Sequence, residues 1–94
     1  MSDAEQNACY CYMVECQDGT FYTGWTTDVE RRVSEHNAGR GARYTRYRRP
    51  VELVYVEELP DRSAAMSREH QLKKLSHHKK ALLTQEFTPQ RGAE

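Results

Sequence analysis

The sequence predicts a small α+β domain in which an antiparallel three-stranded β-sheet is flanked by helices, in the order β-β-α-β-α-α. Three observations lead to this fold. Residues 9–26 are rich in aromatic and β-favouring side chains on both sides of Asp18-Gly19, a dipeptide typical of hairpin turns. Residues 51–57 form a further apolar run of strand length. Stretches with the helical spacing of apolar residues follow both the hairpin and this run.

The hairpin joins strands at residues 9–15 and 20–26, and its loop has two possible geometries. In the first, Asp18 and Gly19 alone form a two-residue loop, which puts Glu15 opposite Tyr22. Because neighbouring side chains on a strand point to opposite faces, Tyr12 and Tyr22 then lie on opposite faces of the sheet.

In the second geometry, residues 17–19 form a three-residue loop with the glycine left-handed in a bulge. Val14 then opposes Tyr22 and Tyr12 opposes Gly24, so both tyrosines share one face. We favour this geometry because a glycine opposite Tyr12 leaves room above the ring, whereas a strand glycine otherwise only weakens the sheet.

A helix is expected directly after the hairpin. Thr27 with Glu30 fits a capping box, Val29 and Val33 supply an apolar stripe, and Gly39 is a natural stop.

Two polar residues of this helix have the spacing of a shared site. Arg32 and His36 are four residues apart and therefore project from the same side, as does Asp28 one turn earlier. A guanidinium and an imidazole beside two phenols suit a phosphate.

The second half of the chain predicts the third strand and two helices. Residues 51–57 carry apolar side chains on both faces, as in a strand inside the sheet or covered by helices, and Pro60-Asp61 ends it. Asp61 or Ser63 can cap a helix that runs to about Leu75, and residues 76–85 form a short packing helix. The order of the strands does not follow from the pattern.

Glu69 lies on the apolar stripe of the first of these helices, which it shares with Ala65, Met66 and Leu72. A carboxylate there is costly unless it is paired, protonated or bound to a cation. Lys73, four residues later, offers a salt bridge, and a divalent metal is the alternative.

Composition places the chain in a general class. Ninety-four residues make one domain, which we expect at 9–85 between flexible tails at 1–8 and 86–94. The hydrophobic content is 37%, no run has the length of a membrane span, and the polar N-terminus is unlike a signal peptide. We therefore expect a soluble cytoplasmic protein without a membrane partner.

Cys9, Cys11 and Cys16 are most simply core thiols.

The charge is unevenly distributed although the net charge is zero. Residues 31–49 contain seven arginines against Glu35 alone, with tyrosines between them. Guanidinium groups suit phosphate oxygens and tyrosine rings stack on exposed bases, so this run predicts a nucleic-acid surface rather than only a solvated loop. The expected contact residues are Arg40, Arg43, Tyr44, Arg46, Arg48, Arg49 and Lys73.

The chain resembles the GIY-YIG nuclease superfamily over residues 9–84. The tripeptide YCY at residues 10–12 stands at the first motif and YTG at residues 22–24 at the second. Arg32 and His36 follow at the family's spacing. The resemblance is to small stand-alone members such as the UPF0213-type bacterial proteins. Trp25 stands where some relatives have a lysine, and Thr23 replaces the isoleucine of the second motif.

The resemblance implies a catalytic site made of Tyr12, Tyr22, Arg32, His36 and Glu69. In it, Glu69 holds Mg²⁺ or Mn²⁺ and Arg32 donates to the phosphate. Tyr22 orients or deprotonates the attacking water, His36 takes its proton directly or through Tyr22, and Tyr12 shapes the pocket and hydrogen-bonds to the water or to Tyr22.

The implied function is a metal-dependent endonuclease acting on DNA, including branched or damaged structures in repair or recombination. DNA is favoured over RNA, and a protein partner that supplies specificity is expected. The alternative is a nucleic-acid-binding module, or a subunit of a complex, that keeps the fold but has little cleavage activity of its own.

Overall fold

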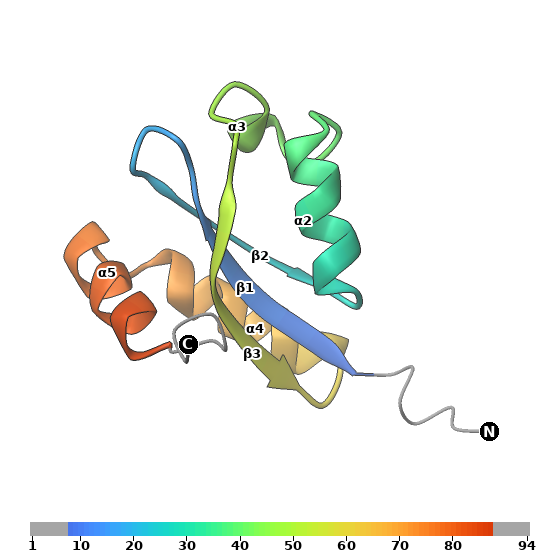
Figure 1. Ribbon diagram of the computed structural model, residues 1–94. Coiled ribbons are helices and arrows are strands. Elements are labelled where there is room, and N and C mark those ends of the chain that lie inside the picture. Colours follow the sequence, from blue (N-terminus) through green and yellow to red (C-terminus); the bar gives the residue numbers. More distant parts are fainter. Residues whose placement is uncertain (1–7, 88–94) are drawn as a thin grey trace, which may run out of the picture.

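The computed structural model of the protein describes residues 8–87, and its elements follow the predicted order with one addition (Figure 1). The addition is α3, a single turn inside the arginine-rich stretch that the sequence alone presented as a loop. The elements are β1 (Cys9–Glu15), β2 (Phe21–Thr26), α2 (Val29–Asn37), α3 (Arg43–Arg46), β3 (Glu52–Leu59), α4 (Arg62–Lys73) and α5 (His77–Glu86).

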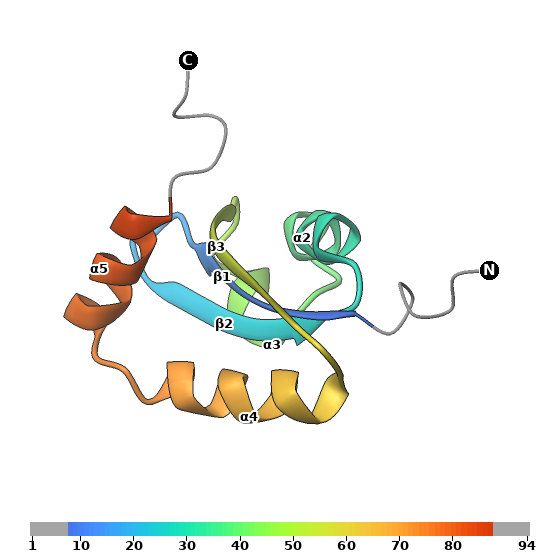
Figure 2. The ribbon, with the colours of Figure 1, turned by 90° about the horizontal axis from the view of Figure 1, so that it is seen from below.

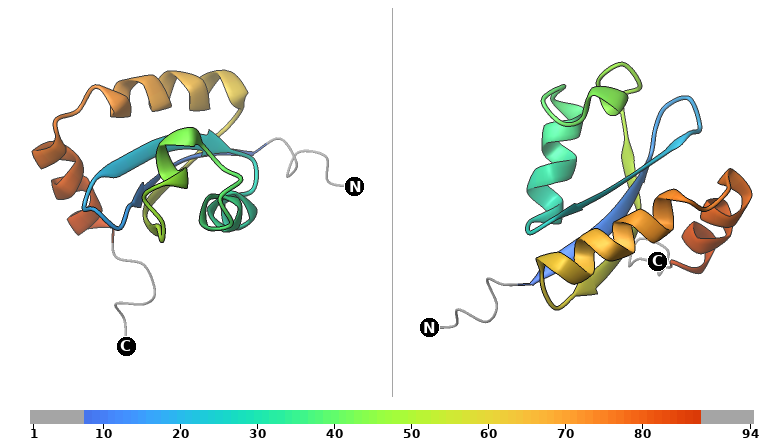
Figure 3. Two further views of the ribbon diagram at one scale, coloured as in Figure 1. Left: turned by 90° about the horizontal axis from the view of Figure 1, so that it is seen from above. Right: turned by 180° about the vertical axis from the view of Figure 1, so that it is seen from behind.

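The three strands form an antiparallel sheet in the order β2-β1-β3, so β1 is the central strand and β3 pairs with it. Helix α2 lies over one face of the sheet and α4 over the other (Figure 2). Strand β3 is therefore an edge strand whose two faces are both covered, which explains why its sequence is apolar on both sides. Helix α5 lies beyond the C-terminal end of α4 (Figure 3).

The hairpin has the three-residue loop that the sequence favoured. Tyr12 pairs with Gly24 and Val14 pairs with Tyr22, so both tyrosines lie on the α2 face. The Gly19 N–H donates to the Cys16 carbonyl at 2.9 Å, and Gly19 itself has φ of 85°. Only glycine adopts this left-handed conformation without strain, which fixes the register of the two strands.

The start of α2 differs from the prediction. Asp28, not Thr27, is the N-cap, and its carboxylate accepts from the Arg31 N–H at 3.1 Å. The Thr26 hydroxyl in turn accepts from the Asp28 N–H at 3.1 Å. The capping box of Thr27 and Glu30 is therefore wrong, and Asp28 is used in the cap instead of joining Arg32.

The core consists of one cluster on each face of the sheet. On the α4 face, Cys9 and Cys11 pack with Ala65 and Leu72. On the α2 face, the buried residues are Tyr12, Val14, Cys16 and Val51. All three cysteines are buried thiols, as predicted.

The C-terminal half needs two corrections of detail. Asp61 caps α4 by accepting from the Ala64 N–H at 2.8 Å, one of the two caps expected, but Met66 is 50% exposed and does not belong to the buried stripe. Helix α5 reaches Glu86, one residue past the helix end expected at 85, and the Phe87 ring packs against Tyr55.

The predicted tails fall almost wholly outside the described residues. Between residues 8 and 87, no helix combines the length and the apolar composition that a membrane span requires.

Candidate active site

The centre of the candidate site is a hydrogen bond of 2.7 Å between the hydroxyl of Tyr12 and Nε2 of His36. Both side chains are almost completely buried, with exposed fractions of 1% and 0%. The phenol reaches this position because it lies over Gly24: a Cβ at that glycine would be 2.7 Å from the Tyr12 oxygen. The absence of a side chain at Gly24 thus leaves the space that the Tyr12 hydroxyl occupies.

The His36 ring is fixed from its other side by the segment that leads into α3. Its Nδ1 accepts from the Ala42 N–H at 3.3 Å and lies 2.8 Å from the Thr45 hydroxyl oxygen. The Thr45 hydroxyl also donates to the Ala42 carbonyl at 3.0 Å, so the imidazole is held in a network with Ala42 and Thr45. A Cβ at Gly41 would overlap the imidazole, so a glycine is required there as well.

This arrangement determines the protonation of both residues. Burial lowers the pKa of His36 to about 4, and the nearby Arg32 charge acts in the same direction. The imidazole is therefore neutral in its hydrogen bond with the Tyr12 hydroxyl. Burial also raises the pKa of Tyr12 to about 12, so the phenol keeps its proton.

The His36 ring is fully buried, and both of its nitrogens have partners within the protein. Nε2 contacts the Tyr12 hydroxyl, and Nδ1 contacts Ala42 and Thr45. In this structure His36 therefore contacts Tyr12 directly.

Arg32 and Tyr22 complete the α2 side of the site. The guanidinium of Arg32 bonds to Glu35 at 2.9 Å, and its side chain is 31% exposed. It is also close enough to Tyr12 to lower the pKa of the phenol, against the larger effect of burial. The Tyr22 ring meets the edge of the His36 ring at a centroid distance of 5.2 Å. The structure therefore brings four of the five predicted residues into one connected cluster.

Glu69, the fifth residue, approaches from α4. Its side chain is 21% exposed and pairs with Lys73 at 3.2 Å, the salt bridge that the spacing offered. Its charge is near enough to act on Tyr12, where it helps to raise the pKa of the phenol. The carboxylate thus acts on the cluster through its charge, from a helix that covers the other face of the sheet.

Glu69 can bind a divalent metal only if water or substrate supplies the other ligands. Across residues 8–87, three or more His, Cys, Asp and Glu side chains nowhere converge as a metal cage would require. Mg²⁺ is commonly held by one or two carboxylates together with water and substrate phosphates. A single half-buried carboxylate suits that mode of binding.

The arginine-rich stretch divides into exposed and structural residues. Arg40, Arg43 and Arg46 are exposed, and none of them forms an ion pair with another described side chain. Arg48 pairs with Asp18 at 3.0 Å, and its guanidinium lies 3.9 Å from the centre of the Tyr44 ring.

Arg49 donates to the Arg46 carbonyl at 2.9 Å and to the Asn37 carbonyl at 3.4 Å. Two of the arginines that were expected to contact nucleic acid therefore hold the fold together as well.

The supporting residues Ala42 and Thr45 were missed by the sequence reasoning. They contact His36 through a loop and one turn of helix, and nothing in the local pattern indicates such a contact. Gly41 carried the one usable signal, since a glycine outside a turn often marks a close approach.

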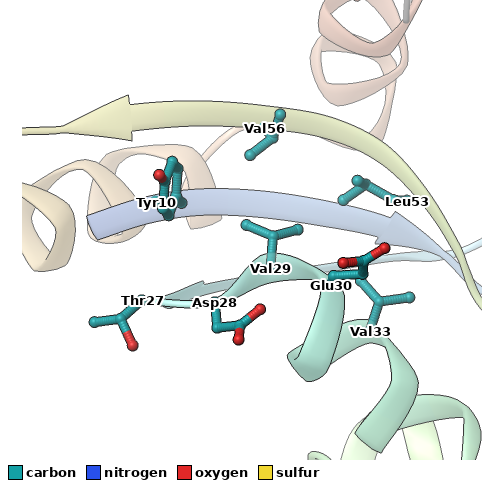
Figure 4. Close-up of a pocket in the computed structure, with 8 residues that line it drawn as sticks. All are labelled: Tyr10, Thr27, Asp28, Val29, Glu30, Val33, Leu53 and Val56. Carbon is teal, nitrogen blue, oxygen red and sulfur yellow. The ribbon is translucent and has the colours of Figure 1, made fainter. Parts of the chain in front are cut away.

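A separate cavity of about 610 Å³ lies between α2 and the sheet and shares no residue with this site. Figure 4 shows its side chains, which come from β1, α2 and β3 and the segment before α2. They are Tyr10, Thr27, Asp28, Val29, Glu30, Val33, Leu53 and Val56.

Comparison with known proteins agrees with this geometry. The model of the GIY-YIG catalytic domain matches residues 8–81, so the chain belongs to the GIY-YIG family of nucleases. Within it, the chain is similar to the UPF0213 proteins. It is 60% identical over 79 residues to one from Haloquadratum walsbyi, and the aligned region covers 84% of this chain and 89% of that protein.

Two solved structures have the same fold. The solution structure of a UPF0213 protein from Bacillus halodurans has 42% sequence identity, covers 92% of this chain and 93% of that one, and gives a TM-score of 0.56. A protein from E. faecalis has 45% identity and a TM-score of 0.57, with 85% of both chains covered. The resemblance that the motifs indicated is thereby confirmed.

Proposed function

We propose that this protein is a metal-dependent endonuclease that hydrolyses phosphodiester bonds in DNA. The observation that carries the proposal is the cluster of Tyr12, Tyr22, Arg32 and His36 beside the carboxylate of Glu69. Two phenols, a guanidinium and a carboxylate are groups that can orient a water, neutralise a phosphate and hold a cation.

In the proposed reaction, water attacks phosphorus, the bond to the 3′ oxygen breaks, and a water proton ends on that leaving oxygen. The products are a 5′-phosphate and a 3′-hydroxyl. Arg32 donates to the phosphate oxygens, where its charge is worth most as negative charge develops. Tyr22 orients the attacking water.

Tyr12 has a narrower role in this proposal than that of a base. Because its hydroxyl keeps its proton and is hydrogen-bonded to His36, it serves as a neutral hydrogen-bonding group for the water or a phosphate oxygen. His36 is a positioning residue that holds the phenol in place. Mg²⁺ or Mn²⁺ on Glu69 would supply a Lewis acid for the phosphate and the leaving oxygen.

The test is cleavage of a labelled panel by the wild type and by Glu69→Ala, with Mg²⁺, with Mn²⁺ and with chelator. The panel contains single-stranded, duplex, 5′-flap, 3′-flap and four-way-junction DNA, with matched RNA. We expect metal-dependent cleavage of at least one DNA structure, with branched DNA as the first candidate, and its loss in the variant.

Two results would overturn the proposal. Cleavage that persists in chelator would show that no metal is required, and cleavage that persists in Glu69→Ala would show that its carboxylate is not required. Binding without cleavage of any substrate would favour the nucleic-acid-binding module, or a complex subunit whose activity depends on a protein partner.

A further inference from the structure

A second, smaller cavity of about 210 Å³ adjoins the candidate active site at β2, which forms one edge of the sheet. Its lining comes from β2, α3, α4 and α5, segments that are far apart in the sequence. The lining residues are Phe21, Tyr22, Thr23, Tyr44, Lys73 and Lys80.

Lys80 gives this cavity an unbalanced positive charge. Lys73 is paired with Glu69, but among residues 8–87 no carboxylate pairs with Lys80, although the side chain is partly buried. Burial and then the charge of Lys73 lower the pKa of Lys80. A partly buried ammonium group without a carboxylate partner is stabilised when an anion enters the cavity beside it.

One residue of the lining carries an unsatisfied hydroxyl. Thr23 is only 3% exposed, and its hydroxyl is the one buried side-chain oxygen or nitrogen in the described part of the chain without a hydrogen-bond partner. Leaving such a group unpaired costs ~1–3 kcal/mol. A rotation of this side chain toward the cavity would let a bound oxyanion accept from the hydroxyl and remove that cost.

The remaining wall is aromatic and leads to the catalytic cluster. The rings of Tyr22 and Tyr44 stack with a centroid distance of 6.0 Å, and Arg48 covers the Tyr44 ring. Tyr22 also contacts His36, so a group in this cavity lies next to the reacting phosphate. A cationic cavity with an aromatic wall suits a phosphate together with its sugar or base.

From the two lysines, the unpaired Thr23 hydroxyl and the stacked tyrosines, we infer that this cavity binds the phosphate of the nucleotide adjacent to the cleaved bond, in the strand that is cut. This inference rests on the proposed nuclease function for the position of the cleaved bond. The inference also predicts a preference for substrates in which that nucleotide is unpaired. The base of an unpaired nucleotide can stack on the aromatic rings instead of on a neighbouring base.

Lys80→Met is the first variant to test, with Lys79→Met as its matched control, because Lys79 is an exposed neighbour on the same helix. Binding of a fluorescent single-stranded DNA is measured in chelator, so that no cleavage interferes. We expect Lys80→Met to weaken binding about tenfold and to reduce the salt dependence of log Kd by about 0.7, while Lys79→Met changes binding less than twofold. Equal effects of the two variants would overturn the inference.

Thr23→Val is the second variant, since it removes the hydroxyl but keeps the shape. A merely structural role predicts lower thermal stability. We expect a midpoint of thermal unfolding that is unchanged or higher, together with binding that is several-fold weaker. Unchanged binding would show that the hydroxyl does not meet the ligand.

Inorganic phosphate and a mononucleotide, each titrated in an NMR experiment, distinguish a strand phosphate from a free one. We expect both to shift the amide of Thr23 more weakly than the oligonucleotide does. Tighter binding of inorganic phosphate would assign the cavity to free phosphate instead.

Absence of cleavage by the wild type, together with selective loss of binding in Lys80→Met, would reject the nuclease proposal and retain the phosphate cavity.

Discussion

Acidification should destabilise this protein through His36 before any carboxylate titrates. The imidazole has a pKa of about 4 in the folded state, because it is buried with Nδ1 against the Ala42 N–H, and an ordinary value of 6.5 when unfolded. Between these values the unfolded chain binds a proton that the folded chain does not. The free energy of unfolding therefore falls as the pH is lowered through this window.

The size of the effect follows from the two pKa values. At ~1.4 kcal/mol per pH unit, their difference corresponds to ~3 kcal/mol, of which ~2 kcal/mol is lost by pH 5. Asp18 and Glu35, whose pKa values are lowered by hydrogen bonds to Thr20 and Arg32, contribute only at lower pH. The interval from pH 7 to pH 5 thus isolates His36.

The assay is urea denaturation at several values between pH 7.5 and pH 4.5 for the wild type, His36→Gln and His70→Gln. His70 is exposed and serves as the matched control. We expect His36→Gln to be less stable at pH 7 but to have a much flatter pH dependence, and His70→Gln to follow the wild type. Parallel curves for the wild type and His36→Gln would refute the reasoning.

Three further predictions concern single residues. Gly24→Ala should displace the Tyr12 phenol and leave the His36 imidazole without this hydrogen-bond partner, at a cost of ~1–3 kcal/mol. It should also lower any cleavage rate, and denaturation and activity assays check both effects. Asp61→Ala should remove the cap of α4 and cost ~1 kcal/mol in urea denaturation, whereas Ser63→Ala should cost almost nothing. Cys11, whose pKa is raised to about 11 by burial, should resist alkylation at pH 8 in the native protein and react in urea, as mass spectrometry can follow.

The fold was largely predictable because its elements are marked locally. Asp18-Gly19 fixed the hairpin, and the glycine opposite Tyr12 correctly selected the loop geometry and the shared face of the tyrosines. The cap of α2 was assigned one residue early, since Thr27 and Asp28 are both good caps and only the path of the chain decides between them.

The site was predictable only in part. Residue spacing placed Arg32 and His36 on one side of α2, but the direction of the hydrogen bonds around His36 depends on Ala42 and Thr45, which reach it through a loop. Sequence reasoning also could not separate exposed arginines from Arg48, because its partner Asp18 is thirty residues away in the hairpin loop. Contacts between segments distant in the sequence leave no periodic signal.

The central claim is that the Glu69 carboxylate belongs to a catalytic centre. It is tested most directly by the single-turnover cleavage rate of Glu69→Gln on any DNA that the wild type cuts. Glu57→Gln is the matched control, because Glu57 is also a partly buried carboxylate in an ion pair, with Arg68 at 2.8 Å. The account predicts a loss of about 100-fold or more in Glu69→Gln and a rate near that of the wild type in Glu57→Gln. Equal rates for the two variants would contradict it.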